Sequence, residues 1–239
     1  MKNRLYTLTG LMMLLIFTTS CSQKIIKENP YDLKLVSTID EYKLEEMKNP
    51  NNVLVDLEKY IPGIVLDIRY ATKNNFTGQK LYKIPKAYAR KPVADSLLKI
   101  QNELKEKGLG LKIYDSYRPY AVTLKFYRIY RDTNFVAAPW KGSSHNTGCA
   151  VDLTLVDIKT GKELQMPTGF DDFTIKASHS YMDLPEKALV NRKLLKDIMI
   201  KHGFVPYSQE WWHYRYKDSN KFGLLDLNFE EIEKIKGKI

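Results

Sequence analysis

The sequence predicts an α+β protein, a single domain in which a central antiparallel sheet is flanked by helices. Two observations support this fold class. The 239 residues are 44% hydrophobic and 12% aromatic, which is enough apolar material for one well-packed domain and little for two. Helical and strand-like segments also follow one another without a regular βαβ rhythm, and this order is typical of an antiparallel sheet with helices packed beside it.

The first twenty residues predict an export signal. Lys2 and Arg4 precede an apolar run, residues 11–17, that is too short to span a bilayer as a mature helix. Small residues before Cys21 resemble the lipobox of bacterial lipoproteins, although Thr18 stands where that pattern usually has Leu. We therefore expect a signal peptide over residues 1–20 and a lipid anchor on Cys21, with simple secretion as the alternative. The protein would be exported to the periplasmic side of the cell envelope and anchored to a membrane without spanning it.

Residues 21–52 are polar and contain Pro30 and Pro50, so we expect a tether there and the folded domain over residues 53–239. Within the domain, apolar periodicity predicts helices at 91–107, 120–131 and 185–202 and strands at 64–70, 111–114, 150–155, 204–207 and 211–216. Pro92 and Gly108 mark the two ends of the first helix, and Gly203 ends the third. Residues 229–239 are expected to form a charged helix or a frayed tail.

The charge pattern argues against a nucleic-acid-binding protein. The formal net charge is +10, but Lys and Arg are scattered and interleaved with Asp and Glu, as on an ordinary solvated surface. With Cys21 at the end of the leader, the domain retains only Cys149, so no internal disulfide can form. Cys149 is expected to be a small buried residue rather than a metal ligand.

The segment from Ser143 to Asp152 carries the most informative chemistry. From Ala150 onward the residues alternate, so that Val151, Leu153 and Leu155 face a core and Asp152 faces the opposite way. Gly148 permits a sharp bend before the strand that could bring His145 back over Asp152. An imidazole and a carboxylate that converge in this way are two of the three protein ligands that a catalytic zinc needs.

The third ligand is expected at a distance in the sequence, at His213 in the stretch Glu210-Trp211-Trp212-His213. Together with His145 and Asp152 it would leave a fourth position for water, so we predict one Zn²⁺ per chain, at the sheet. Glu210 would be the general base. Residues three apart on a regular strand face opposite sides, so Glu210 can reach the metal only from the turn before the strand or through a bulge.

Arg118 is a candidate for stabilising the negative oxygen of a tetrahedral transition state. Each of these residues also has an ordinary explanation when taken alone: a surface His, an aromatic packing cluster, or an Arg paired with a carboxylate. His202 is expected to be a helix C-terminal residue favoured by the helix dipole, and His179 a loop residue rather than a ligand.

The motifs taken together resemble the zinc D,D-peptidases related to the vancomycin-resistance dipeptidases. The likeness rests on Ser143-x-His145-x-x-Gly148-x-Ala150-x-Asp152 and, downstream, Glu210-x-Trp212-His213. Further segments resemble the D-alanyl-D-alanine dipeptidase branch, and the likeness extends from Val53 to Tyr216. These segments are Asp67–Thr72 with Asn75–Gly78, Asp115-Ser116-Tyr117-Arg118-Pro119, and Phe170-Asp171-Asp172-Phe173.

The resemblance implies a role for each matching residue. It assigns zinc to His145, Asp152 and His213, the base to Glu210 and transition-state stabilisation to Arg118. It places Tyr70 and Asp171 at the free amine of a dipeptide, and Ser143 with Ser144 at its carboxylate. Asp172, beside Asp171, could face the amine instead.

The implied activity is hydrolysis of the dipeptide D-Ala-D-Ala to D-alanine in the cell envelope. One alternative is a D,D-carboxypeptidase or endopeptidase that acts on peptidoglycan stem peptides. Another is a non-catalytic wall-binding lipoprotein, which predicts loss of a catalytic residue, whereas all five candidates are present. The sequence does not indicate an oligomeric state.

Overall fold

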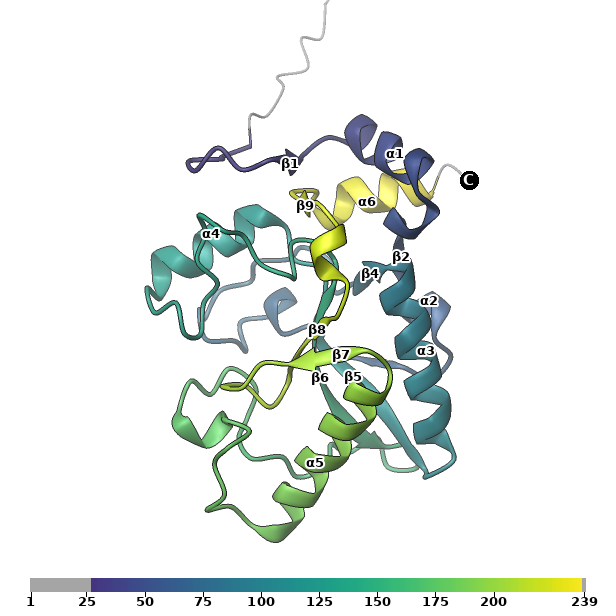
Figure 1. Ribbon diagram of the computed structural model, residues 1–239, viewed down its shortest axis with the longest axis vertical. Coiled ribbons are helices and arrows are strands. Elements are labelled where there is room, and N and C mark those ends of the chain that lie inside the picture. Colours follow the sequence, from purple (N-terminus) through teal and green to yellow (C-terminus); the bar gives the residue numbers. More distant parts are fainter. Residues whose placement is uncertain (1–26, 238–239) are drawn as a thin grey trace, which may run out of the picture.

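The computed structural model describes residues 27–237, and its centre is a five-stranded sheet in the order β3-β5-β6-β8-β7 (Figure 1). All neighbouring pairs are antiparallel except β3 with β5, which is parallel. The predicted α+β domain with an antiparallel sheet is therefore confirmed, with one parallel edge strand added. The strands are β3 (Val65–Leu66), β5 (Leu109–Asp115), β6 (Ala150–Asp157), β8 (His213–Tyr216) and β7 (Phe204–Pro206).

Strand β6 has the predicted alternation, but both of its faces are covered. Val151, Leu153 and Leu155 are fully buried in the core, as expected. Asp152 and Thr154, on the other face, are also buried. The polar face of this strand is thus covered by protein rather than solvated, and Asp152 on it lines a pocket.

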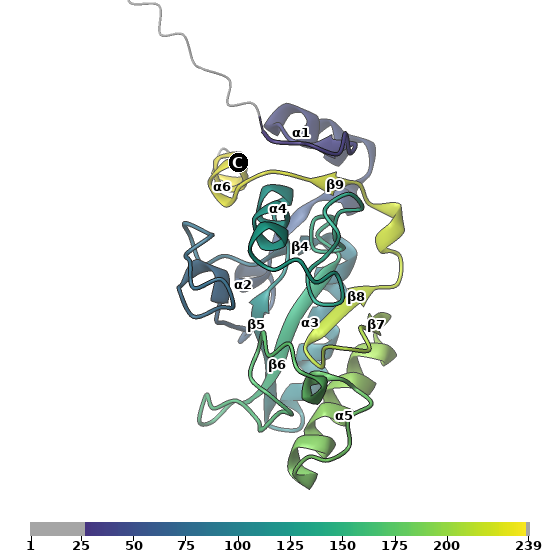
Figure 2. The ribbon, with the colours of Figure 1, turned by 90° about the vertical axis from the view of Figure 1, so that its left-hand side faces the viewer.

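The three predicted helices are present: α3 (Lys91–Lys105), α4 (Tyr120–Ile129) and α5 (Glu186–Lys201). Helix α3 contacts β5, and α5 contacts β7 and β6, so the two long helices lie along the sheet (Figure 2). Gly108 and Gly203 follow α3 and α5 with φ values of 71° and 88°. These left-handed conformations are easy for glycine and end the helices at the predicted places.

The tether prediction is wrong for the part of residues 21–52 that the structure describes. Helix α1 (Ile39–Lys48) begins with a capping box between Thr38 and Glu41. Tyr42 on this helix is buried, and its hydroxyl accepts a hydrogen bond from the Leu54 N–H at 2.6 Å. Helix α1 buries only this one side chain, so its sequence is mostly polar. The sequence pattern therefore did not reveal that this segment belongs to the folded domain.

The two ends of the described chain pack together (Figure 1). Strand β1 (Leu35–Val36) pairs in parallel with β9 (Leu224–Leu225), and α1 contacts α6 (Phe229–Lys236). The predicted C-terminal helix is therefore present. The predicted leader and Cys21 lie outside the described residues. Within residues 27–237 no helix combines the length and apolarity that a membrane crossing requires.

The remaining elements are short, and the sequence pattern did not reveal most of them. The strand predicted at 64–70 is reduced to β3, and a 3-10 helix over Arg69–Ala71 follows it. A separate two-stranded sheet pairs β2 with β4 in antiparallel register. These elements are β2 (Leu54–Asp56), α2 (Leu57–Tyr60), β4 (Tyr88–Arg90) and 3-10 turns at Pro50–Asn52, Ile175–Ala177 and Ser219–Lys221.

Candidate metal centre and active site

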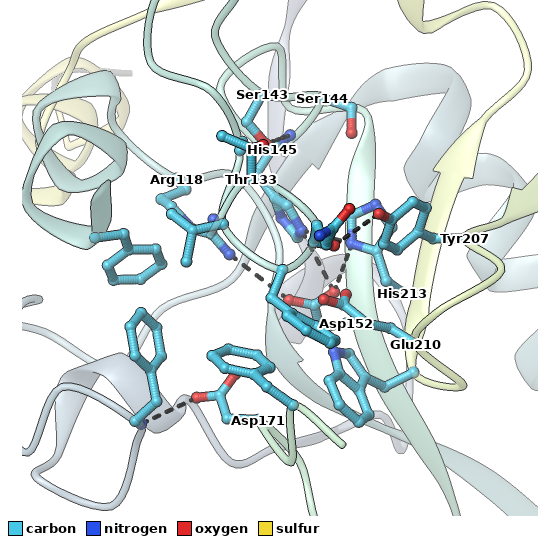
Figure 3. Close-up of a pocket in the computed structure, with 18 of the residues that line it drawn as sticks. Arg118, Thr133, Ser143, Ser144, His145, Asp152, Asp171, Tyr207, Glu210 and His213 are labelled. Atoms are coloured by element: carbon cyan, nitrogen blue, oxygen red, sulfur yellow. Dashed lines mark hydrogen bonds and ion pairs between the residues drawn. The ribbon is translucent and has the colours of Figure 1, made fainter. Parts of the chain in front are cut away.

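The fold brings His145, Asp152 and His213 together from three separate segments (Figure 3). Asp152 on β6 is directly paired with His213, the first residue of β8, so their side chains emerge side by side. His145 lies in the loop before β6. Gly148 bends that loop with a φ of 75°, and a Cβ added there would stand 2.9 Å from the Leu54 side chain. Glycine is therefore required at position 148 for the loop to turn over Asp152.

The spacing of the three side chains fits a zinc ion. His145 Nε2 lies 3.1 Å from His213 Nδ1 and 3.4 Å from Asp152 Oδ1, and the His213–Asp152 distance is 2.9 Å. Ligand atoms around a tetrahedral zinc are about 3.3–3.6 Å apart, given bonds of about 2.0–2.2 Å. Among residues 27–237, one group of three or more His, Cys, Asp or Glu side chains lies close enough together to hold a metal ion, and it consists of these three residues.

Hydrogen bonding prepares His145 as a ligand. Its Nδ1 donates to the backbone carbonyl of Ser116 at 2.6 Å, which leaves Nε2 unprotonated and directed at the other two ligands. Burial lowers the pKa of His213, against the opposing effect of Asp152. Burial alone would raise the pKa of Asp152, but both imidazoles reverse this and bring it below its usual range. Zinc requires neutral imidazoles and an ionised carboxylate as ligands, and the lowered pKa values of His213 and Asp152 favour those forms for these two residues.

Glu210 lies in the turn between β7 and β8, where its N–H donates to the Tyr207 carbonyl at 3.3 Å. It thus precedes the strand that His213 begins, as its approach to the metal requires. Glu210 is 6% exposed and lines the same pocket as the three ligands. Burial, followed by the nearby charges of Asp152 and Asp171, raises its pKa well above the ordinary range. A carboxyl group with a raised pKa is suited to accept and release a proton near neutral pH.

Arg118 is fixed by a carboxylate whose role the sequence did not reveal. Its Nε and Nη2 both lie within hydrogen-bond distance of Asp115 Oδ2, at 2.9 and 2.8 Å. Arg118 Nη2 is also 3.7 Å from Asp152, and its guanidinium lies over the Phe126 ring at 4.5 Å. Tyr82 donates to the second oxygen of Asp115 at 2.9 Å. In the sequence, the signal that Asp115 holds Arg118 was their spacing, three residues apart in the same motif.

Asp171, not Asp172, faces the pocket. Its oxygens accept hydrogen bonds from the Tyr70 hydroxyl at 3.0 Å and from the Phe76 N–H at 3.3 Å. Asp172 instead accepts from the Thr174 N–H at 3.1 Å, outside the pocket lining. Asp171 has a left-handed backbone with a φ of 62°, a strained conformation for a non-glycine residue. Burial raises the pKa of Asp171 to about 7.

The pocket has a volume of about 270 Å³, and Ser143 and Ser144 line it with the residues above. In Figure 3 Asp171 lies at one end and the two serines at the other, with His145, Asp152 and His213 between them. Residues 133–137 form a further part of the wall that the sequence did not indicate. The Tyr207 hydroxyl donates to the Asn134 carbonyl at 2.7 Å, which joins this wall to the β7–β8 turn.

The other histidines and Cys149 lie outside this pocket lining. His202 follows the last residue of α5, as predicted, and its Nε2 lies 3.0 Å from Glu103. Burial lowers the pKa of His179 to about 4. Cys149 is fully buried, and burial raises the pKa of its thiol to about 11. A protonated, enclosed thiol is a poor ligand, in keeping with the predicted packing role.

Two imidazoles and a carboxylate, with a glutamate and an arginine in the same pocket, are typical of metal-dependent hydrolases. A family model described as D-Ala-D-Ala dipeptidase (peptidase M15) matches residues 50–235. The chain therefore belongs to the D-Ala-D-Ala dipeptidase family of metallopeptidases. This membership confirms the predicted family and class of enzyme.

Individual relatives agree with the family match. A D-alanyl-D-alanine dipeptidase of Escherichia coli (strain K12) is 34% identical over 176 residues, which cover 74% of this chain and 91% of that protein. One of Enterococcus faecium is 31% identical over 182 residues, 68% of this chain and 90% of that protein. The solved structure of a vancomycin-resistance D,D-dipeptidase, VanXYg, covers 77% of this chain and 76% of its own at 20% identity and a TM-score of 0.34. That structural likeness supports no inference about this chain.

Proposed function

We propose that this enzyme hydrolyses the dipeptide D-Ala-D-Ala to D-alanine with one zinc ion per chain. The observation that carries the proposal is the convergence of His145, Asp152 and His213 in a pocket of about 270 Å³ that also contains Glu210 and Arg118. Four relatives that match this chain are named D-alanyl-D-alanine dipeptidases. A pocket of this size suits a molecule no longer than a dipeptide.

His145, Asp152 and His213 would hold the zinc, whose chemistry when bound is to polarise a carbonyl and to lower the pKa of water from about 15.7 to about 7. Glu210 takes a proton from the attacking water and delivers it to the leaving amine. Arg118, with its guanidinium fixed by Asp115, donates hydrogen bonds to the oxygen that becomes negative in the transition state. A donor held in advance stabilises that charge without reorganising as the reaction proceeds.

The two ends of the pocket would recognise the two ends of the dipeptide. Asp171, positioned by Tyr70 and the Phe76 N–H, is the counter-ion for the substrate ammonium group. Ser143 and Ser144 offer hydroxyl groups to the carboxylate at the opposite end (Figure 3). A site that binds both charged termini discriminates against longer peptides, because one terminus would then lack its partner.

A second candidate is a D,D-carboxypeptidase or endopeptidase acting on peptidoglycan stem peptides. The open position of the metal site and the base serve that reaction equally well. The pocket wall over residues 133–137 and the half-buried Asp171 favour the dipeptide, because a longer chain would have to extend past them. A non-catalytic wall-binding protein is disfavoured because the full set of catalytic groups is present.

The location is part of the proposal. The basic start, the apolar run and Cys21 support export and lipid attachment on the outer side of the cytoplasmic membrane or in the periplasm. Metabolic labelling with palmitate should mark the protein and should fail to mark a Cys21→Ser variant. Equal labelling of both forms would reject the lipid anchor but leave export open.

The activity is tested by offering the purified enzyme free D-Ala-D-Ala and, separately, a muropeptide pentapeptide. We expect release of D-alanine from the dipeptide, loss of turnover with a chelator, and recovery when zinc is restored. Bound zinc measured by atomic absorption should be one per chain. Cleavage of the pentapeptide alone would replace the dipeptidase with the carboxypeptidase.

A further inference from the structure

The surface near the start of the described chain carries a cluster of aromatic rings. Tyr31 and Trp140 are 41% and 44% exposed. Their ring centroids lie 6.1 Å apart, and the Trp140 centroid lies 5.5 Å from that of the half-buried Tyr127 on α4. None of the three residues lines the catalytic pocket, so the proposed reaction gives this cluster no role.

Contacts with α4 hold both sides of the cluster in place. Arg128 of α4 forms an ion pair with Glu28, in the segment before β1. Tyr120, the first residue of α4, donates its hydroxyl hydrogen to the Pro139 carbonyl at 3.0 Å, directly before Trp140 in the chain. The folded domain therefore presents the rings in a fixed arrangement, which reduces the entropy lost when they meet a partner.

The charges beside the rings have both signs. Lys141 follows Trp140 and is exposed. Asp32 follows Tyr31 and is also exposed, as is Lys34. Net charge is therefore a weak source of attraction at this surface, and the rings have to supply most of it. Trp and Tyr combine an apolar body with a polar tip, and this combination suits the boundary between lipid headgroups and acyl chains.

The position of the cluster fits a bilayer as the partner. Six Cα–Cα steps separate Cys21 from Lys27, the first described residue, and they span at most about 22 Å. A domain of about 210 residues has a radius of gyration of about 17 Å, so its diameter is about 40 Å. A lipid on Cys21 would keep the end of the domain that carries β1 near the bilayer and would leave α5, at the opposite end, out of reach (Figures 1 and 2).

We propose that the surface formed by Tyr31, Tyr127 and Trp140 rests against a lipid bilayer, with its rings at the level of the headgroups. The orientation of the domain rests on the proposed lipid attachment at Cys21, and the aromatic surface adds a second contact. Two contacts fix how the domain lies on the membrane, which a single attachment point does not.

Trp140 is itself the reporter for this contact. The chain has three tryptophans, and Trp211 and Trp212 are each 1% exposed. The test uses the chain that begins at residue 22, which retains every described residue and has no lipid. It is mixed with vesicles of phosphatidylethanolamine and phosphatidylglycerol that carry bromine on the acyl chains near the headgroup. We expect saturable quenching of the Trp140 fluorescence and sedimentation of the protein with the vesicles.

Two substitutions test whether the cluster makes the contact. Trp140→Ser and Tyr31→Ser should each lower the sedimented fraction about threefold or more, because each removes an aromatic ring from the headgroup region. Val190→Ser is the matched control, since Val190 is an apolar residue of α5 that is 58% exposed, and it should leave the fraction unchanged. Thermal unfolding of each variant checks that the domain is intact, and either aromatic variant suffices if the other fails to fold.

The absence of quenching would overturn the proposal, and so would an equal loss of sedimentation in the Val190→Ser variant. Sedimentation with purified peptidoglycan but not with vesicles would assign the rings to the cell wall instead. The outcome is independent of the proposed activity, because no turnover is measured. It is also distinguishable from failure of the lipid anchor: a chain that palmitate does not label but that binds vesicles keeps this contact, whereas a labelled chain without quenching loses it.

Discussion

Arg118 and Arg90 are both buried, and each guanidinium group must find partners in place of water. Arg118 finds carboxylates, whereas Arg90 finds neutral groups. Arg118 is 7% exposed and meets carboxylates, with Asp115 at 2.8 Å and Asp152 at 3.7 Å. Arg90 is 2% exposed and meets only neutral groups. Its guanidinium donates to the backbone carbonyls of Thr147, Asn52 and Gly223, and lies over the Phe222 ring.

The surroundings shift the pKa values of the two guanidinium groups in opposite directions. Burial lowers the pKa of Arg90, and the opposing effects of its neighbours, Glu45 among them, are too small to reverse this. Burial alone would lower the pKa of Arg118 as well, but Asp115 and its other neighbours raise it above the usual range. Arg118 therefore provides a fixed charge in the pocket, whereas Arg90 provides a donor fork that joins three chain segments.

Arg90 nevertheless acts on the same site from outside it. Its Nε donates to Thr147 at 2.7 Å, and its own N–H donates to the Gly148 carbonyl at 2.9 Å. Both acceptors belong to the loop that presents His145. In the proposed mechanism, one arginine thus contributes charge to the pocket and the other holds the backbone beside a candidate metal ligand. Their substitutions are therefore expected to fail in different assays.

Arg90→Met should have the largest effect, a loss of about 3–5 kcal/mol in the free energy of unfolding. The buried carbonyl of Thr147 and the part-buried carbonyls of Asn52 and Gly223 lose their donor at once. A buried carbonyl costs about 1–3 kcal/mol when left unsatisfied, and the lost packing of the buried side chain adds to this. Metal affinity should fall about tenfold or more, because the His145 loop is no longer held. Denaturant unfolding and zinc titration measure the two effects.

Arg192→Met is the matched control for that variant. Arg192 is also buried and donates to two carbonyls, those of Ser178 and Tyr181, but it lies outside the catalytic pocket lining. It should lose stability and retain the metal affinity of the wild type. Equal loss of zinc in both variants would show that the effect is global destabilisation and not loop positioning.

Arg118→Lys should leave stability and zinc content near wild type and lower kcat by about 10²–10³-fold. Lysine keeps the charge beside Asp115 but lacks the planar fork that can bond the carboxylate and the developing oxyanion together. Steady-state kinetics on D-Ala-D-Ala, with zinc content measured on the same sample, separates a loss of turnover from a loss of zinc. A kcat within threefold of wild type would remove Arg118 from the mechanism.

The contrast between the arginines also explains what the sequence could and could not reveal. Arg118 lies in a motif with Asp115 three residues away, and both metal-ligating strand positions follow from alternation and register. The partners of Arg90 are backbone carbonyls at positions 52, 147 and 223. Every residue type has such a carbonyl, so the sequence at these positions carries no signal of the contact. The sequence pattern therefore predicted residues whose side chains meet in the pocket and missed those that act through the backbone.

The same reasoning accounts for the missed N-terminal layer. Helix α1 buries only Tyr42 and β1 has two residues, so neither produces a periodic apolar signal over a useful window. Their attachment comes from long-range contacts with β9 and α6. The choice between Asp171 and Asp172 was open for a similar reason, since only the backbone conformation decides which carboxylate enters the pocket.

Asp115→Asn should lower kcat by about 10–100-fold with little change in KM. The amide keeps the size of the carboxylate but loses the charge that holds Arg118, and such supporting residues are typically worth this much. The Tyr82 hydroxyl can still donate to the remaining oxygen. Asp95→Asn, which breaks an exposed pair with Lys91, is the control and should have wild-type kinetics.

Asp171→Asn should have the smallest effect at its optimum, a rise in KM of roughly tenfold, but it should change the pH profile. Burial raises the pKa of Asp171 to about 7, so in the free enzyme the ionised form that binds the substrate ammonium is lost as pH falls through 7. The wild-type kcat/KM should therefore decline on the acid side with an ionisation near pH 7 from Asp171 beside that of Glu210, and the variant should lose the Asp171 ionisation and keep that of Glu210.

The stability of Asp171→Asn gives an independent check of the direction in which the pKa of Asp171 is shifted. A carboxyl whose pKa is higher in the folded state than in the unfolded state binds its proton more tightly when folded, so it favours folding at low pH and opposes folding once it ionises. That opposition develops between about pH 4 and pH 7, since the ordinary pKa is about 3.9. Asp171→Asn should thus be more stable than wild type above pH 7 and no more stable at pH 4. Thermal unfolding of both proteins across this range measures the difference, and a variant that is less stable at pH 8 would mean that Asp171 is ionised and well paired in the fold, like Asp152.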